Sequence, residues 1–469
     1  MTSQTTIEVP DSPVARAGSH DAAERVTAAV IILLALAVQI SAGLRGGAIG
    51  QDFPIHYGNM LLAAGSPVHW IFGAYQRTNP PLFYSFGALV FKVAGKDAWP
   101  YVIGVINACL NVPALVGLYI LSRWLLIRPG LRLSLLCFVA FLPAFQITSV
   151  VFAADAYCQT PFLGALIAIV AFLSGRIGFR TMTVWLTSAV AVLVSLKYTA
   201  VCLIPAGIVT FLIIGWIRRA TWRPALSAAI IYTLVTGLLA AYWIKQQPAN
   251  ISDHFEARMG GDLGSPNQMN LRSILFFRYG DLALLRGPTY WKLVPSDPRD
   301  PKSLFHANYF SYPGLLCLAT FSDVLNIFQP KPKGVRYGQR TGYKQRLTRL
   351  ASSLGELCFI GIFTGFLFSV IQSARELVLT RRPGESATLI LAMFAFSWHV
   401  LIIVLLMTVT MATAFGYWLP RLILPALMVY PLIALHPVSV TSLGKSRIFN
   451  VALFSLVLVQ AAVHTLILT

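Results

Sequence analysis

Charged side chains are scarce in this sequence of 469 residues. Asp, Glu, Lys and Arg together make up 11% of it, whereas hydrophobic residues make up 57% and the mean hydropathy is +0.70. A soluble domain carries about 25% charged residues, so this chain has too few ionic groups to cover a surface in water. The composition excludes a soluble globular protein and indicates a protein that lies in lipid.

Cysteine pairs and metal-ligand motifs are missing as well. The six cysteines are scattered through or beside apolar segments, without a CxxC pair or the spacing of a metal site. Such cysteines are typical of small buried hydrophobic residues. No cofactor is expected from these patterns, and they leave open whether a divalent metal takes part.

What the sequence has in abundance is apolar runs of roughly 20 residues, the length of a helix that crosses a bilayer. They predict an all-α integral membrane protein with about 11 transmembrane helices. The expected spans are residues 26–44, 100–122, 132–151, 157–174, 182–196, 198–216, 224–244, 354–374, 387–411, 415–436 and 448–468.

Basic residues outnumber acidic residues by 36 to 17, and they gather in the short connections between the apolar runs. Examples are Arg123, Arg128, Arg176, Arg180, Arg218, Arg219, Arg223, Arg381 and Arg382. Basic short loops mark the cytoplasmic side of a membrane protein, and they explain the net charge of +19 without nucleic-acid binding. We therefore expect a cytoplasmic N-terminus, an external C-terminus and no nucleic-acid partner.

Two long polar insertions then fall on the external side of the membrane. The predicted organisation is a cytoplasmic tail (1–25) and a transmembrane module (26–244) whose first external loop (45–99) carries the chemistry. A second external loop (245–353) and the C-terminal helices (354–469) follow. Both external loops are expected to carry helices that lie along the membrane surface.

The first insertion contains an acid shortly after the first span. A carboxylate such as Asp52 can act as a general base that takes the proton of a sugar hydroxyl, although an isolated Asp more often caps a helix or meets solvent. His56 lies four residues further on, where it would share a helical face with Asp52 and orient it.

The segment from Asn79 to Tyr84 contains two prolines, which are tolerated in the first turn of a helix. Leu82, Leu89, Val90 and Val93 then line one side of about four helical turns. This stretch is too short to cross a bilayer. It predicts an interfacial helix that lies along the membrane surface.

Three further charged residues are expected at the external edge of the bundle. Asp155 lies in a tight turn between two spans, where an acid is costly unless it is paired or hydrated. Lys197 lies at the junction of the fifth and sixth spans, where a lysine can also simply snorkel to the surface. Arg421 lies near the external start of the tenth span, where a cation suits an anionic ligand such as phosphate.

Taken in order, these segments resemble the GT-C glycosyltransferases. The most similar group depends on polyprenyl phosphate and includes the protein O-mannosyltransferases and the lipid A aminoarabinose transferases. It has a first-loop Asp, a Pro-Pro-Leu-aromatic-Tyr helix, an acidic turn before the fourth helix, a Leu-Thr-Lys-Tyr-like junction and a late Arg-Tyr-x-x-Pro element. The matching positions here are Asp52, Pro80 to Tyr84, Asp155 to Pro161, Leu196 to Thr199, Arg421 to Pro425 and, for a Phe-Gly-Asp segment, Phe321 to Asn326.

The resemblance implies a membrane glycosyltransferase that moves a sugar, with inversion, from a polyprenyl-phosphate donor to a glycan, lipid or protein acceptor. It implies a bacterial inner membrane as the location, with the site on the periplasmic side. Asp52 is the implied base, with Asp155 as the second choice. The implied substrate-binding and phosphate-binding residues are His56, Asn79, Tyr84, Lys197, Arg421 and Asp323.

The sequence also departs from this group and leaves two other functions open. Asn79 stands where relatives carry His or Lys, Leu422 replaces the Tyr of Arg-Tyr, and the second loop lacks the soluble sugar-binding domain of the protein O-mannosyltransferases. An outer-leaflet polysaccharide polymerase or ligase would use a diphosphate-linked glycan instead. A secondary transporter would need broken helices, mid-membrane polar residues and pseudo-repeated halves.

The predicted topology can be tested with cysteines that are labelled from outside intact cells. Residues 305–328 are apolar enough for a twelfth span, but a central Asp323 would cost about 3 kcal/mol, so we favour a surface helix there. We expect Gly260→Cys and Gly338→Cys both to be labelled. Labelling of the first with protection of the second would establish the extra span and invert every later helix.

Overall fold

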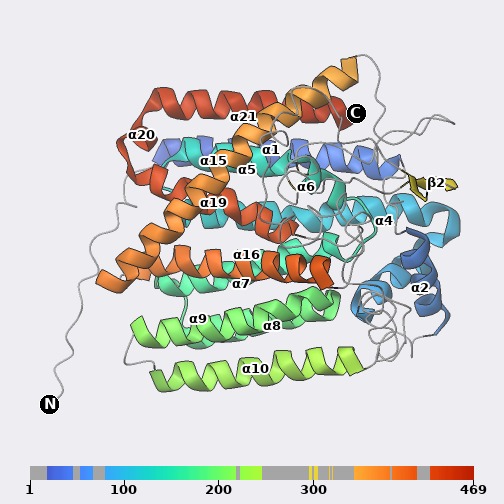
Figure 1. The fold of residues 1–469 in the computed structure, drawn as a ribbon, viewed down its shortest axis with the longest axis horizontal. Helices are drawn as coiled ribbons and strands as arrows, with labels where there is room; N and C mark the ends of the chain where they lie inside the picture. Colours follow the sequence, from blue (N-terminus) through green and yellow to red (C-terminus); the bar gives the residue numbers. More distant parts are fainter. Residues whose placement is uncertain are drawn as a thin grey trace.

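The fold is described here from a computed structural model. The described residues are 18–45, 53–66, 80–217, 222–245, 295–297, 300–304, 316, 320, 343–380, 383–408 and 423–468. They form a bundle of long helices that run back and forth along one common direction (Figure 1). The prediction of an all-α integral membrane fold is confirmed for this part of the chain.

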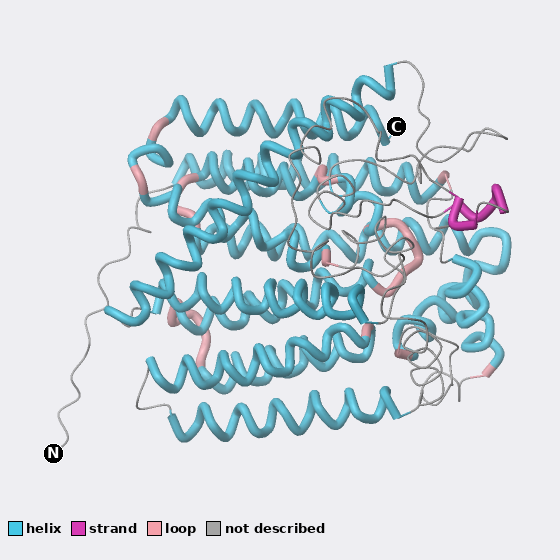
Figure 2. Tube along the Cα trace, viewed as in Figure 1, coloured by secondary structure: helices cyan, strands magenta, loops and turns pink. Residues whose placement is uncertain are grey.

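The helices follow the apolar runs closely. They are α1 (Gly18–Leu44), α2 (Phe53–Gly65), α4 (Pro81–Leu125), α5 (Pro129–Ala140), α6 (Pro143–Thr148), α7 (Asp155–Leu173), α8 (Phe179–Leu196), the 3-10 turn η2 (Tyr198–Cys202), α9 (Leu203–Ile217), α10 (Trp222–Lys245), α15 (Tyr343–Thr380), α16 (Pro383–Thr408), α19 (Leu424–Val440), α20 (Ser442–Lys445) and α21 (Arg447–Leu468). A short antiparallel hairpin of β1 (Pro295–Asp297) and β2 (Asp300–Leu304) adds the only strands of the described residues (Figure 2).

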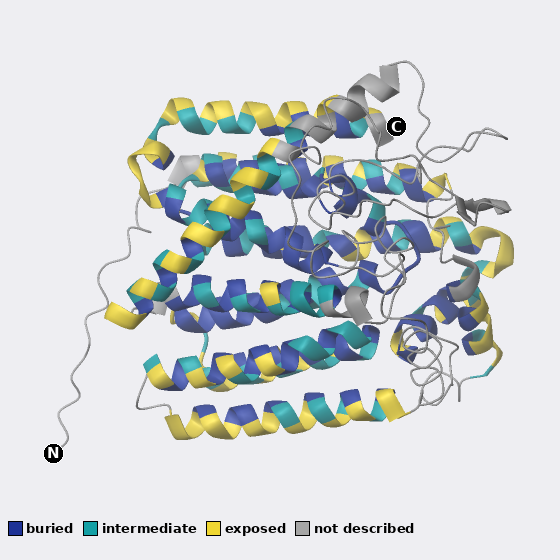
Figure 3. Ribbon diagram, viewed as in Figure 1, coloured by how far each residue is buried: buried dark blue, intermediate teal, exposed yellow. Residues whose placement is uncertain are grey.

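Within the described ranges, nine helices are long and apolar enough to cross a membrane, and α5 and α19 are shorter apolar helices. Their outer faces carry exposed hydrophobic side chains, whereas the faces that meet other helices are buried (Figure 3). On α10, for example, Leu238 is 67% exposed while Tyr232 is fully buried. An apolar outer surface is what contact with lipid requires.

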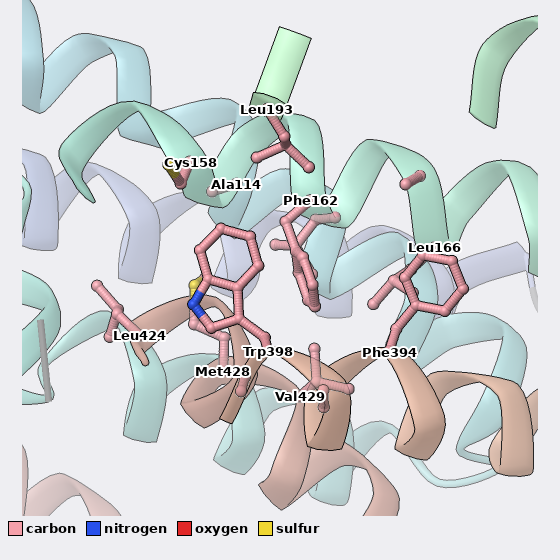
Figure 4. Close-up of a cluster of buried hydrophobic side chains, with 14 of the residues drawn as sticks. Ala114, Cys158, Phe162, Leu166, Leu193, Phe394, Trp398, Leu424, Met428 and Val429 are labelled. Atoms are coloured by element: carbon pink, nitrogen blue, oxygen red, sulfur yellow. The ribbon is translucent and has the colours of Figure 1, made fainter. Parts of the chain in front are cut away.

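Helix α7 lies in the middle of the bundle and packs on α4, α8, α16 and α19. Figure 4 shows the centre of this contact, where Phe162 and Leu166 of α7 meet Phe394 and Trp398 of α16. The rings of Phe162 and Trp398 meet edge to face with centroids 5.6 Å apart. This tightly filled core fixes α7 and therefore the residues at its first turn.

One predicted span is wrong because it is not a single helix. The sequence pattern predicts a single helix over 132–151, but the structure divides it into α5 and α6. Pro143 causes the break, because a proline inside a helix has no N–H to donate and clashes with the preceding turn. The chain then continues without helix from Ser149 to Ala154 and is buried throughout that stretch.

The predicted interfacial helix is present as the first part of α4. It begins at Pro81 and ends in a kink at Gly95, whose φ of 77° is accessible to glycine without strain. Leu82, Leu89 and Val93 are 43%, 49% and 83% exposed, as expected for a stripe that faces lipid. Val90, which was predicted on the same stripe, is instead buried.

Charged side chains collect at the opposite end of the bundle from α2 and the hairpin. There Arg123 and Arg25 both pair with Asp21, while Arg132 pairs with Glu24 at 3.4 Å. The pairs of Arg123 and Arg132 connect the start of α1 with the end of α4 and the start of α5, whereas Arg25 lies on α1 itself. This basic end is the one that the positive-inside pattern assigns to the cytoplasm.

Helices α1 and α4 approach each other closely at Gly43. A Cβ atom there would lie 2.9 Å from the backbone carbon of Gly104, which cannot turn aside. We therefore expect Gly43→Ala to separate the two helices and to destabilise the fold by about 1–3 kcal/mol, as overpacking does. The measurement is the apparent melting temperature of the purified protein in detergent.

Gly237 of α10 provides the matched control, because nothing lies within 4 Å of a Cβ placed there. Gly237→Ala should leave the melting temperature unchanged or raise it slightly, since alanine favours a helix over glycine by about 1 kcal/mol. Equal melting temperatures for the two variants would contradict the close packing of α1 on α4.

Candidate functional site

The candidate site lies at the end of the bundle that is opposite the basic end. Four segments meet there: α2, the first turns of α4, the buried loop 149–154 with the start of α7, and the junction of α8 with η2. Figure 1 shows α2 and the start of α4 beside the ends of the longer helices. The polar residues of these segments are almost entirely buried.

An ion pair between Lys197 and Asp155 forms the charged centre of the site. Each side chain is only 7% exposed. Asp155 is in the first turn of α7 and Lys197 is the C-cap of α8, so each charge lies at the helix end whose dipole stabilises it. The two residues are 42 positions apart in the sequence, and the antiparallel packing of α7 on α8 brings them together.

A second polar group surrounds the hydroxyl of Tyr84, on the first turn of α4. Asn59 of α2 donates to this hydroxyl at 3.1 Å, and Nδ1 of His56 lies 3.1 Å from it. All three residues are buried. These contacts hold α2 against α4.

Aromatic side chains pack around this network. Phe152 of the buried loop stacks on Phe83 with ring centroids 4.6 Å apart and meets Trp99 edge to face at 4.9 Å. Gly87 makes room for the ring, because a Cβ there would come within 2.5 Å of Phe152. The loop therefore has one well-defined position relative to α4.

Hydrogen bonds from a side-chain amide of α4 fix the same loop. Asn107 of α4 donates to the carbonyls of Val150 and Val151 at 3.3 and 3.1 Å. Its own carbonyl oxygen accepts from the hydroxyl of Tyr157 at 2.5 Å. One buried amide thus satisfies backbone oxygens of the loop, which would otherwise be costly to bury, and also anchors the first turn of α7.

The structure brings together four of the residues that the sequence singles out. His56 contacts Tyr84, and Asp155 pairs with Lys197. Lys197 does not snorkel, because it is buried and points at a carboxylate. The other four candidates, which are Asp52, Asn79, Asp323 and Arg421, lie outside the described residues.

Sequence reasoning misses the neutral residues that position these groups. Asn59 follows His56 by three residues and so shares its helical face, which is a signal that was available. Asn107 and Phe152 give no such signal, because their partners depend on how α4, α7 and the loop pack. No group of His, Cys, Asp and Glu in the described part of the chain could hold a metal ion.

The arrangement combines one buried cation, one buried carboxylate and a tyrosine hydroxyl with polar neighbours. A buried ammonium group is a strong binding site for an anionic oxygen once its carboxylate partner is displaced or shared. A carboxylate held in an ion pair is a poor proton acceptor, because the pair stabilises its ionised form. The chemistry of the described residues is therefore better suited to holding an anion than to general-base catalysis by Asp155.

Comparison with known proteins gives matches in structure only. No family model matches the sequence, and no curated protein matches it. The oligosaccharyltransferase of Archaeoglobus fulgidus in its apo form matches with a TM-score of 0.47 and 15% identity, over 94% of this chain and 55% of that one. The chain thus spans about half the length of that protein.

Two further matches carry bound lipid phosphates. The archaeal oligosaccharyltransferase AglB of A. fulgidus, in complex with an inhibitory peptide and a dolichol-phosphate, has a TM-score of 0.47 and 14% identity over 95% of this chain and 55% of that one. ArnT from Cupriavidus metallidurans, bound to undecaprenyl phosphate, has a TM-score of 0.38 and 14% identity over 89% of this chain and 78% of that one.

The central ion pair can be tested by a double-mutant cycle. Asp155→Asn and Lys197→Met each leave one buried charge without its partner, which typically costs about 3–5 kcal/mol. The measurement is the apparent melting temperature in detergent. We expect it to fall strongly in both single variants and to return most of the way to that of the unchanged protein in the double variant. A double variant that is as unstable as the two losses added together would show that the residues are not coupled.

Proposed function

We propose that this chain is a membrane glycosyltransferase that takes its sugar from a polyprenyl-phosphate carrier at the site end of the bundle. The acceptor is a glycan, lipid or protein. The observation that carries the proposal is the buried Lys197–Asp155 pair, at the same end as the short helix α2 and the part of α4 that comes before the kink at Gly95. A bacterial inner membrane, with the site on its periplasmic side, is part of the same proposal.

The depth of Lys197 is what suits a lipid phosphate. Burying two charges in an apolar bundle is expensive, and a well-packed apolar pair would stabilise the helix ends more simply. A cation held at this level lies near the depth of phosphate headgroups, where a phosphodiester of the carrier can share it with Asp155. Arg421, which matches the Arg of the Arg-Tyr-x-x-Pro element in the group that the sequence resembles, would be a second phosphate ligand.

The lipid tail would reach this position from the membrane rather than from water. Leu61 and Leu62 of α2 are 40% and 49% exposed, and Leu82, Leu89 and Val93 of α4 form a second exposed apolar row. The exposed apolar rows of the short helix α2 and of the first part of α4 suit helices that lie along the membrane interface. They place the polar network of Tyr84 directly beside the hydrocarbon region in which a polyprenyl chain dissolves.

The proposed reaction is a displacement at the anomeric carbon of the donor. The acceptor hydroxyl gives its proton to the carboxylate of Asp52, and its oxygen forms a new bond to the anomeric carbon. The bond from that carbon to the carrier phosphate breaks, so the configuration inverts and the carrier leaves as a phosphate monoester. The phosphate becomes more negative as it changes from a diester to a monoester, and a fixed cation such as Lys197 stabilises the added negative charge.

Asp52 is a better candidate for the base than Asp155. Its position one residue before α2 is adjacent in sequence to the segment that carries His56, whereas Asp155 is committed to Lys197. His56 and Tyr84 would contact the sugar or orient the acceptor. Asn79 and Asp323 remain proposed substrate contacts on the resemblance alone.

We expect Asp52→Asn to lower sugar transfer by about 10²–10⁴-fold, the usual effect of removing a general base. Donor binding and melting temperature should stay close to those of the unchanged protein. The measurement is release of the carrier from undecaprenyl phosphate loaded with a radiolabelled hexose, in membranes that contain the chain. Membranes of the same host without the chain give the background.

Asp97→Asn is the matched control, because Asp97 lies in the same insertion and is exposed. It should transfer at the normal rate. A normal rate in Asp52→Asn beside an inactive but folded Asp155→Asn would move the base to Asp155. Transfer from a diphosphate-linked donor alone would support the polymerase or ligase instead, and no transfer from either donor would contradict a glycosyltransferase.

A further inference from the structure

Gln159 of α7 is buried without any visible reason in the packing of the helices. Its side chain is fully buried, and among the described residues neither its Nε2 nor its Oε1 has a hydrogen-bond partner. No other side-chain amide among the described residues has both its nitrogen and its oxygen buried and unpaired. Buried polar groups in native proteins are nearly always paired, so such an exception requires an explanation.

The position of Gln159 connects it with the candidate site. It follows Asp155 by four residues, which puts both side chains on one face of α7, with Gln159 about 6 Å deeper along the helix axis. The hydroxyl of Thr160 donates to the carbonyl of Leu110 at 3.0 Å and fixes α7 against α4 at this depth. Gln159 therefore lies one helical turn below the Lys197–Asp155 pair, toward the centre of the bundle.

Other unpaired polar atoms occur on the segments around the ion pair. They are the hydroxyl of Ser149 in the buried loop, the hydroxyl of Thr199 in η2 and Oδ1 of Asn111 in α4. Asn111 is one residue beyond Leu110, so it lies at about the depth of Gln159. All of these groups are neutral, and together they offer both donors and acceptors.

The chemistry of an amide distinguishes between the possible ligands. A phosphate oxygen only accepts hydrogen bonds, so it would satisfy Nε2 but would face the carbonyl dipole of Oε1 unfavourably. A hydroxyl group both donates and accepts, and two neighbouring hydroxyls would satisfy both ends of one carboxamide. The unpaired donor and acceptor of Gln159 match a sugar ring rather than a second phosphate.

We propose that Gln159 binds the sugar of the donor by two hydrogen bonds to neighbouring hydroxyl groups, while the carrier phosphate lies at Lys197. This inference rests on the proposed function and names the part of the substrate that the described residues recognise. One helical turn between the cation and the amide is a distance on the scale of a single sugar ring. Gln159 would then select carriers whose sugar has free neighbouring hydroxyls.

The test compares binding of bare and loaded carriers to Gln159→Met in detergent. Methionine has nearly the length of glutamine but neither hydrogen-bonding atom. The probes are undecaprenyl phosphate and the same lipid carrying glucose, mannose or galactose. We expect the unchanged protein to bind at least one loaded carrier more tightly than the bare one. Gln159→Met should lower the affinity for that loaded carrier by about tenfold or more. The same variant should change the Kd of the bare carrier by less than about twofold.

The melting temperature separates this role from a structural one. Replacing an unpaired buried amide by an apolar group of the same shape is neutral or stabilising, so Gln159→Met should melt at the same temperature or higher. The matched control is Gln460→Met on α21. Gln460 is also buried and has an unpaired Nε2, but α21 packs on α5 and α15, away from the site. It should bind every probe as the unchanged protein does.

Three results would overturn the inference and leave the proposed function intact. They are an equal loss of affinity for bare and loaded carriers, a fall in melting temperature that accompanies the loss, and an unchanged preference for the loaded carrier in Gln159→Met. A failure of the unchanged protein to bind any loaded carrier more tightly than the bare one would also overturn it. If the unchanged protein binds no form of the carrier, the proposed function falls together with the inference.

Discussion

A charge inside an apolar helix bundle needs an opposite charge within reach, and this constraint organises the site end of the molecule. Lys197 and Asp155 are both buried, so neither could be tolerated there alone. Their pairing requires α7 to begin and α8 to end at the same level, each with the helix terminus that favours its charge. The unwound loop 149–154 comes directly before α7, and the 3-10 turn η2 comes directly after Lys197 at the end of α8.

The buried loop 149–154 shows how the structure tolerates irregular backbone at membrane depth. Non-helical backbone is viable there only if protein groups satisfy its N–H and C=O groups. Asn107 does so for the carbonyls of Val150 and Val151, and the N–H of Ala153 also donates to the Val151 carbonyl, at 2.9 Å. Phe152 then closes the space between the loop and α4. The loop is thus part of the packed core, and it holds Asp155 in a fixed position.

Much of this fold could be predicted from the sequence, because the spans are set by a one-dimensional property, namely the length of an apolar run. The start of α4 at Pro81 and its exposed leucine row follow from local rules in the same way. The site is different in kind. Asp155, Lys197, His56 and Tyr84 could each be recognised as polar residues at helix ends, but that Asp155 faces Lys197 rather than solvent depends on which helices become neighbours. The break at Pro143 had a local signal, and the length of the apolar run obscured it.

The two ends of the bundle use charge for different purposes. At the basic end, Asp21 pairs with Arg123 of α4 and Glu24 pairs with Arg132 of α5, and these pairs hold α1, α4 and α5 together. At the site end Lys197 and Asp155 cancel each other within one buried pair, and the unpaired polar groups on the segments around them are neutral amides and hydroxyls. A site built in this way has little net attraction for free anions from solution. It would favour a ligand with three parts: an apolar anchor that dissolves in the membrane, a phosphate that can share Lys197, and hydroxyls that can satisfy the neutral groups one turn deeper. A lipid-linked sugar combines all three.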